Sequence, residues 1–200
     1  MKLHFFDDGS AEDIPNLPGV YAFFYRGLSS KLFGFIGNQR PISAVRSIAK
    51  KITTTQLTAF TKSHYIGEFY SDSQSSHIRP PFNARLESNA PGRVADQIAE
   101  IDDSDLKGFI ELMSASAVFQ RPLYVGITTE QTLAERYLQH RQAYYQSGIG
   151  FGSSVKNAGF VWSNLIFGCI PYEDQRLSSQ ATRTAERLIQ SLSSPIFSKQ

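Results

Sequence analysis

Three stretches of the chain combine aromatic and β-branched residues in a pattern that is typical of buried strands. They run from Gly19 to Tyr25, from Pro122 to Thr128 and from Phe160 to Ile170. Because side chains alternate along a strand, Tyr21 and Phe23 should point to the same face of the sheet. The pattern therefore predicts three core strands, with the Tyr21 side chain on a defined side.

A helix is predicted directly after the second of these strands. Thr132 and Glu135 have the spacing of a capping box, in which each side chain binds a free backbone amide at the start of a helix. Arg136 and His140 follow in the same helix, and a spacing of four residues places their Cβ atoms roughly 5–6 Å apart on one face. Two cationic or ionisable groups should therefore lie beside the strand that carries Tyr124.

A second helix is predicted near the end of the chain, from Ser178 to Leu192. Residues at helical spacing should form its apolar stripe, namely Ala181, Ala185, Leu188 and Leu192. Glu186 lies in the middle of this helix, beside the stripe. We expect the stripe to face the core and Glu186 to lie at its boundary.

The remaining segments show weaker patterns. Residues 1–13 are polar after two phenylalanines and should form a loose or edge segment. Between residues 26 and 120 the pattern favours strands at 31–37 and 65–70, helices at 42–52, 93–101 and 104–119, and a loop at 71–92. Residues 144–158 are rich in glycine and serine, so we expect a link without regular structure there.

Composition limits the classes of function. The 200 residues, 41% of them hydrophobic, suffice for one generous domain or for a smaller domain with a large insertion. With 20 basic and 18 acidic side chains the formal net charge is only +2, so any site for a polyanion must be local. Cys169 is the only cysteine, which excludes an intrachain disulfide and a cysteine-cluster metal site. We expect a reducing, cytoplasmic environment and no membrane segment, since no apolar run approaches about 20 residues.

The polar residues near these core elements are suited to the hydrolysis of a phosphodiester. They are Tyr21, Tyr124, Arg136, His140 and Glu186. An arginine can stabilise the charge that develops on the phosphoryl oxygens, and a carboxylate can hold one Mg²⁺ that assists the departing oxygen. Histidine and tyrosine can transfer a proton if the site shifts their pKa values.

The order of these motifs resembles that of the GIY-YIG nuclease family. The motifs are PGVY at 18–21, LYVGIT at 123–128, L-x-x-R-x-x-x-H at 133–140, and ERLI at 186–189 followed by Pro195. No single motif is specific, but the ordered combination is. The resemblance covers residues 14–25 and 121–198, and residues 26–120 are then an insertion between the first two core strands.

The resemblance implies a small α/β (α+β) domain, in which helices flank a three-stranded antiparallel sheet, and one divalent cation. Tyr21 would orient or deprotonate the attacking water, assisted by Tyr124 and His140. Arg136 would stabilise the pentavalent phosphoryl group, and Glu186 would bind Mg²⁺ or Mn²⁺. Cleavage would leave 3′-hydroxyl and 5′-phosphate ends.

Two departures from the family pattern are visible in the sequence. Many relatives carry an asparagine three residues after the proline, where this chain has Ser198. Relatives also usually separate the two tyrosine motifs by a short hairpin. A rival alignment therefore takes Phe35-Ile36-Gly37 as the second motif, followed by Arg46 and Lys50.

The resulting hypothesis is a metal-dependent DNA endonuclease in restriction or another defence against foreign DNA, with residues 26–120 supplying recognition. Its candidate nucleic-acid contacts are Arg40, Arg46, Lys50, Lys51, Lys62, Arg79 and Arg85. A non-catalytic nucleic-acid-binding or interaction module is the alternative, and cleavage of branched or single-stranded DNA is a third possibility. One site per chain makes a homodimer a natural way to break both strands. His64 and His77 lack partners at ligand spacing and are expected to be ordinary surface residues.

Overall fold

The fold is described by a computed structural model. It describes residues 2–29, 41–62, 95–146, 148–172, 179–193 and 195–197. The strands expected at 31–37 and 65–70 and the loop expected at 71–92 lie outside the described residues. The rival motif Phe35-Ile36-Gly37 also lies outside them, so that alignment stays a prediction.

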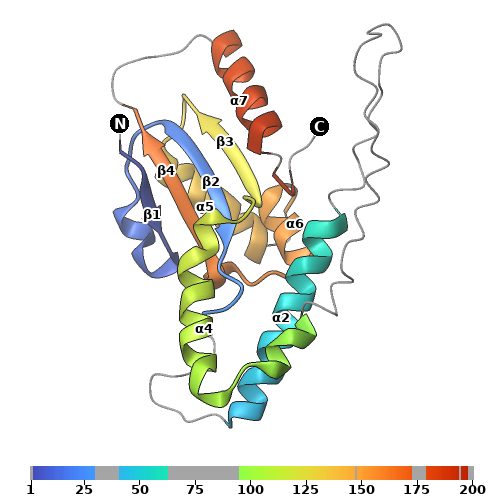
Figure 1. The fold of residues 1–200 in the computed structure, drawn as a ribbon. Coiled ribbons are helices and arrows are strands. Elements are labelled where there is room, and N and C mark those ends of the chain that lie inside the picture. Colours follow the sequence, from blue (N-terminus) through green and yellow to red (C-terminus); the bar gives the residue numbers. More distant parts are fainter. Residues whose placement is uncertain are drawn as a thin grey trace, which may run out of the picture.

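Within the described residues, four antiparallel strands form one sheet in the order β1-β4-β2-β3 (Figure 1). They are β1 (His4–Phe6), β2 (Gly19–Tyr25), β3 (Tyr124–Thr128) and β4 (Leu165–Pro171). The prediction of an α+β chain with an antiparallel sheet is confirmed, and β2 has its predicted bounds. The prediction of three strands is wrong, because β1 from the N-terminal segment pairs with the otherwise free edge of β4.

β4 is shorter than the predicted strand. The prediction began it at Phe160, whereas the structure forms the short 3-10 helix η5 (Trp162–Asn164) before Leu165. The Trp162 indole packs against Tyr137 at a ring-centroid distance of 5.7 Å and donates to its hydroxyl at 3.2 Å. This tertiary contact turns the chain out of the strand conformation at a position where the local pattern favoured it.

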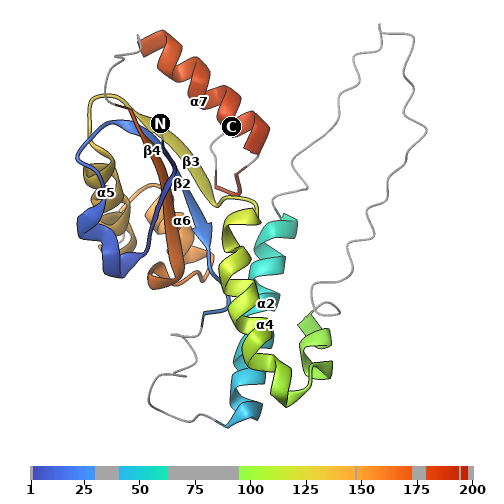
Figure 2. The same ribbon diagram turned by 60° about the vertical axis from the view of Figure 1, so that its left-hand side comes forward.

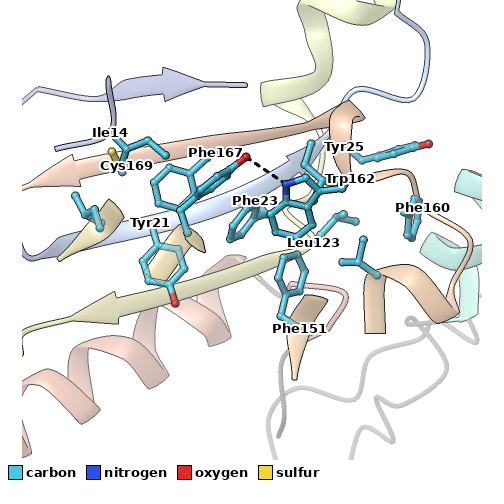
Figure 3. Close-up of a cluster of buried hydrophobic side chains, with 14 residues drawn as sticks. Ile14, Tyr21, Phe23, Tyr25, Leu123, Phe151, Phe160, Trp162, Phe167 and Cys169 are labelled. Carbon is cyan, nitrogen blue, oxygen red and sulfur yellow. Dashed lines mark hydrogen bonds between the residues drawn. The ribbon is translucent and has the colours of Figure 1, made fainter. Parts of the chain in front are cut away.

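The core lies on the face of the sheet that Tyr21 and Phe23 share. Alternation along β2 buries these two side chains together with Tyr25, as the strand pattern predicted. The cluster is rich in aromatic rings, and Figure 3 shows Phe23 at its centre, with ring centroids 4.7 Å from Phe151 and 5.1 Å from Phe167. Large rings that pack at such distances hold the sheet and its covering helices in one arrangement.

Helices α5 (Leu133–Tyr145) and α6 (Phe151–Asn157) cover this face. The predicted capping box of Thr132 and Glu135 begins α5. The prediction of an irregular link at 144–158 is wrong, since α6 occupies half of it. Its glycine serves close packing: a Cβ at Gly152 would lie 2.1 Å from the backbone oxygen of His140 in α5.

The 3-10 helix η1 (Asp8–Asp13) ties the N-terminal segment to α5. One carboxylate oxygen of Asp8 accepts from the Tyr137 hydroxyl at 3.0 Å and lies 3.1 Å from Nε of Arg141. The described part of the N-terminal segment, residues 2–13, therefore contains an edge strand and a short 3-10 helix held against α5.

Helix α7 (Ser179–Ser193) lies along β3 (Figure 1). The helix itself is confirmed, but its predicted apolar stripe is wrong: Leu188 and Leu192 are 58% and 86% exposed. Half-buried Glu186, Ile189 and Gln190 face inward instead. The reason is that α7 meets the edge of β3, whose outward backbone carbonyls need hydrogen-bond donors, and not an apolar sheet face.

Helices from the predicted insertion form a second apolar cluster. They are α2 (Ile42–Lys62), η3 (Gln97–Glu100) and α4 (Asp103–Ala115), and the 3-10 helix η4 (Ser116–Phe119) follows α4. The buried members of the cluster are Leu28, Val45, Ala49, Ile98, Leu106 and Ile110. Figure 2 shows α2 and α4 side by side, beyond the end of the sheet.

The helices of this segment differ in length from the predictions. α2 continues past the predicted end at residue 52 to Lys62. Of the helix expected at 93–101, the described part is helical at residues 95–96 and continues as η3. α4 with η4 matches the predicted helix at 104–119. No helix in the described residues has both the length and the apolar character that a membrane span requires.

Candidate active site

The Tyr21 hydroxyl is the point at which three of the predicted site residues meet. It lies 3.0 Å from Nε2 of His140, and it accepts hydrogen bonds from Nε and Nη2 of Arg136 at 3.4 and 3.3 Å. The Tyr21 side chain is only 1% exposed, and Figure 3 shows its hydroxyl directed away from the core rings around it. β2 and α5, which are distant in sequence, thus meet at one polar atom.

Gly126 of β3 makes room for the Tyr21 ring. The two residues lie opposite each other in the β2–β3 ladder. A Cβ at Gly126 would lie 2.7 Å from both Cζ and the hydroxyl oxygen of Tyr21, and 3.0 Å from Cε1 of Tyr124. The glycine of the YVG motif is therefore needed for the close approach of the two tyrosines.

Tyr124 and Glu186 complete the group. The Tyr124 ring centroid lies 6.0 Å from that of Tyr21 and 5.4 Å from that of His140. Burial raises the pKa of Tyr124, and the negative charge of Glu186 raises it further. The charge of Glu186 acts on both Tyr124 and Arg136. Of the five predicted residues, Tyr124, Arg136 and His140 line one hollow.

Burial shifts the pKa values of Tyr21 and His140 in opposite directions. It lowers the pKa of His140 to about 3, with a further contribution from the charge of Arg136, so the imidazole is neutral at neutral pH. Burial raises the pKa of Tyr21 above its ordinary value, so the hydroxyl keeps its proton. Arg136 can only donate, so the Tyr21 hydroxyl can donate to Nε2 of His140 when the imidazole hydrogen is on Nδ1.

Two glutamines that sequence reasoning missed orient Arg136. Its Nη1 donates to Oε1 of Gln139 at 2.8 Å and to Oε1 of Gln131 at 3.3 Å. Partial burial by itself lowers the pKa of Arg136, but its interactions with Tyr21, Tyr124 and Glu186 raise it overall, so the guanidinium stays charged. The spacing of Gln139, three residues after Arg136 on the same helix, was a signal that could have identified it.

Glu186 is the carboxylate that could hold a divalent cation. It is half-buried, and its Oε1 accepts from Nε2 of Gln190 at 3.5 Å. The described residues contain no group of three or more His, Cys, Asp or Glu side chains arranged so that they could hold a metal ion. One carboxylate nevertheless fits Mg²⁺, which usually keeps several waters and binds proteins through one or two carboxylates together with substrate phosphates.

A hollow of about 510 Å³ adjoins these residues. Its walls include Tyr124, Arg136 and His140, and α6 with the turn before it supplies a wall that the sequence did not indicate. Ile149 in that turn is 95% exposed. A larger cavity of about 900 Å³ lies between α2, η3 and α4, but its lining is mostly apolar and includes none of the five predicted residues.

The structure uses two of the predicted nucleic-acid contacts internally. Nη1 of Arg46 donates to three backbone carbonyls, those of Ile98, Ala99 and Ile101, at 2.6–3.0 Å, and Lys50 forms an ion pair with Asp96. Arg46 therefore ties α2 to η3. The assignments of Arg46 and Lys50 as DNA contacts stay predictions.

The other predicted contacts are less constrained by the structure. Lys51 is exposed on α2. Arg40, Arg79 and Arg85 lie outside the described residues, as do Ser198, His64 and His77, and the side chain of Lys62 is not described. These assignments stay predictions.

The low pKa of His140 predicts that the fold loses stability in acid. In the unfolded chain histidine takes up a proton near pH 6.5, whereas in the folded protein its pKa is about 3. The unfolded state therefore binds more protons between these values, so the free energy of unfolding is fully retained above about pH 6.5 and falls towards pH 3. When the pH is lowered from 7.5 to 4.5, the free energy of unfolding measured with urea should fall by about 2–3 kcal/mol more in the wild type than in His140→Gln. Equal losses in the two proteins would show that His140 is not held neutral.

The site therefore contains a charged arginine, a protonated tyrosine hydroxyl bonded to a neutral imidazole, and a nearby carboxylate, all supplied by elements of the sheet and its flanking helices. These groups can stabilise an anion, orient a water molecule and transfer a proton. Comparison of the chain with protein-family models, with curated proteins and with solved structures gives no significant match.

Proposed function

We propose that the protein is a metal-dependent endonuclease of the GIY-YIG type, which hydrolyses DNA phosphodiester bonds to 5′-phosphate and 3′-hydroxyl ends. The contact of the Tyr21 hydroxyl with both Arg136 and His140 carries this proposal. At one atom it joins a hydroxyl, a guanidinium cation and an imidazole, which are groups that can orient the attacking water, stabilise negative charge and accept a proton. Restriction or another defence against foreign DNA is the setting that we infer.

The pairing of β2 with β3 supports the assignment of the two tyrosine motifs. Phe23 lies opposite Tyr124 in this pair, although residues 26–120 separate the strands in the sequence. A long insertion can join two neighbouring antiparallel strands without changing their pairing. The last residue of β2 and the first residue of β3 lie at the same end of the sheet, whatever the length of the connection between them. The insertion is then available for DNA recognition.

The pKa directions favour a proton-relay role for Tyr21 over that of a resident base. Because its hydroxyl keeps its proton, Tyr21 does not act as a resident phenolate base. The attacking water gives its proton to the Tyr21 oxygen while the hydroxyl passes its own proton to Nε2 of His140. A bound phosphate anion next to Arg136 offsets the positive charge that helps to lower the His140 pKa, so substrate binding makes this transfer easier.

Arg136 stabilises the phosphoryl oxygens during the attack. Its guanidinium is half-buried and is held on both sides, by the Tyr21 hydroxyl and by the two glutamine oxygens. An arginine that is oriented before the reaction loses little energy to rearrangement when negative charge develops in the transition state. Glu186 would hold the divalent cation, which when bound supplies a positive charge for the departing 3′ oxygen.

Exposed arginines on α7 offer a surface for the DNA backbone. Arg183 and Arg187 are both exposed and four residues apart, so they lie on one face of the helix that carries Glu186. Positive side chains at this position would attract phosphates to the neighbourhood of the site. The modest net charge of the chain is compatible with such local attraction.

A cleavage assay on plasmid DNA tests the proposed function. Purified protein should nick or linearise the plasmid in Mg²⁺ or Mn²⁺ and not in EDTA, and DNA ligase should reseal the nicks, since they carry 5′-phosphate and 3′-hydroxyl ends. Glu186→Gln should lower the rate by about 100-fold or more, because loss of a group that supports a metal site has effects of that size. Glu130→Gln, at an exposed turn before α5, is the matched control and should leave the rate unchanged.

The substrates should include unmodified, methylated and branched DNA, so that a requirement for base modification or for a branched structure is also tested. DNA binding without metal-dependent cleavage of any of them would reject the nuclease and favour the non-catalytic module. Cleavage that persists in EDTA, or products that ligase does not reseal, would reject the proposed chemistry.

A further inference from the structure

Gln190 connects the candidate metal carboxylate to the sheet. It follows Glu186 by one helical turn in α7, and its Nε2 donates to the backbone oxygen of Val125 at 3.1 Å and to Oε1 of Glu186 at 3.5 Å. Val125 directly follows Tyr124 in β3. One amide group therefore links the strand of the second tyrosine motif to the helix of the glutamate.

The position of Gln190 follows from the edge of the sheet. Among the residues that the structure describes, β3 is an edge strand, so no described strand pairs with its outward carbonyls. The carbonyls of Pro122 and Leu123 accept from the backbone of Ile196 and Phe197 at 3.2 and 2.9 Å, and the carbonyl of Val125 accepts from Gln190. The amide nitrogen of Gln190 is thus bound to a backbone oxygen of the sheet, the carbonyl oxygen of Val125.

The hydrogen bonds also orient the other end of the amide. The Val125 and Glu186 oxygens both accept from the amide nitrogen of Gln190. The carbonyl oxygen of the same amide group therefore points away from these two acceptors. Within the described part of the chain this oxygen accepts no hydrogen bond, and Gln190 lines the hollow that Arg136 and His140 also line.

A carboxylate beside an amide carbonyl oxygen is an arrangement that suits a divalent cation such as Mg²⁺. Such a cation prefers oxygen ligands and retains several bound waters, which themselves donate hydrogen bonds. A carboxylate that is held in place by a partner binds a metal more tightly than one that must first be ordered. Gln190 supplies both features, since it holds one oxygen of Glu186 and leaves the other for the cation.

We infer that Gln190 is a positioning residue of the cation site, which holds Glu186 against β3 and offers its own carbonyl oxygen to the waters of the bound ion. The inference rests on the proposed function for the role of the ion, but it concerns cation binding itself and can be measured without DNA. No feature of the sequence motif assigned this role to Gln190.

The test measures Mn²⁺ binding to the full chain by the loss of the electron paramagnetic resonance signal of free Mn²⁺. Gln190→Met keeps the length of the side chain and removes both hydrogen bonds, so it should weaken Mn²⁺ binding by about 10- to 100-fold. Loss of the bond to Val125 should lower the melting temperature by about 2–4 °C. Cleavage by this variant should recover when the Mg²⁺ concentration is raised, with DNA affinity unchanged.

Gln190→Lys separates the two contacts. The ammonium group can still donate to the Val125 carbonyl, so the melting temperature should stay near that of the wild type. Its charge should pair with Glu186 and repel the cation, so Mn²⁺ binding should weaken at least as much as in Gln190→Met. Gln180→Met, at an exposed position of the same helix, is the matched control and should bind Mn²⁺ normally.

The outcomes distinguish this inference from the proposed function. Wild-type Mn²⁺ affinity in Gln190→Met, with or without a lower melting temperature, would reduce Gln190 to a structural contact and overturn the inference. Absence of Mn²⁺ binding in the wild type would overturn it as well. If Gln190→Met weakens Mn²⁺ binding but the wild type cleaves no DNA, the cation site stands and the nuclease fails.

Discussion

Replacement of Arg136 by alanine should lower the rate of DNA cleavage by about 10³-fold, the scale expected for an arginine that stabilises a phosphoryl transition state. The guanidinium binds the Tyr21 hydroxyl through Nε and Nη2 and the oxygens of Gln131 and Gln139 through Nη1. Its loss removes the cation and releases the Tyr21 hydroxyl from one of its partners. Arg136→Lys should recover little of the rate, because a single ammonium group cannot reproduce this set of bonds. The measurement is the single-turnover rate at saturating Mg²⁺ and DNA.

Arg141→Ala is the matched control for this prediction. Arg141 lies in the same helix, but it interacts with Asp8 of η1, with Nε 3.1 Å from the carboxylate. Its removal should lower the free energy of unfolding by about 1 kcal/mol or less and leave the cleavage rate within about twofold. A similar loss of rate in both variants would indicate that the Arg136 effect is a general disturbance of α5 and would count against its proposed role.

Replacement of Gly126 by alanine should damage both the fold and the activity, although glycine has no side chain that could take part in the chemistry. The new Cβ would lie 2.7 Å from the Tyr21 ring and hydroxyl and 3.0 Å from the Tyr124 ring. The Tyr21 ring cannot move freely, because it is buried in the core. Overpacking of this kind costs about 2–3 kcal/mol of unfolding free energy. Displacement of the Tyr21 hydroxyl by about 1 Å should also lower the cleavage rate by about 100-fold.

Gly108→Ala, at a glycine of α4, is expected to change the stability in the opposite direction. A Cβ there meets no atom within 4 Å, so the variant should be more stable by up to about 1 kcal/mol, because alanine favours a helix more than glycine does. Urea unfolding and the plasmid assay measure both variants side by side. If Gly126→Ala unfolds and cleaves as the wild type does, the close packing of the two tyrosines around Gly126 is not what holds the site together.

Local patterns were sufficient where neighbours in sequence decide the structure. The alternation of GVYAFFY gave β2 its bounds and placed Tyr21 on the buried face. The capping box of Thr132 and Glu135 gave the start of α5, and helical spacing then put Arg136 and His140 on one face. In each case the physical cause lies within a few residues, in side-chain alternation or in the amides of a first helical turn.

The same patterns failed where packing against a distant segment decides the structure. Glycines that suggested a link at 144–158 allow α6 to approach α5 closely, as Gly152 shows. The apolar stripe that suggested the buried face of α7 lies at the surface, because the helix meets the polar edge of β3. Gln190 had no visible role until that edge supplied its acceptor.

Taken alone, the sequence determined which residues share a face of one element: it placed Tyr21 on the buried face of β2 and put Arg136 and His140 on one face of a capped helix. It also placed Glu186 on a later helix, without the correct buried face of that helix. Only the tertiary structure decided that Tyr21, Arg136 and His140 share one hydrogen-bonded point, that β1 completes the sheet, and that Gln190 holds Glu186. The reason is that periodicity encodes the direction of a side chain relative to its own element, whereas the partner it meets depends on how separate elements pack.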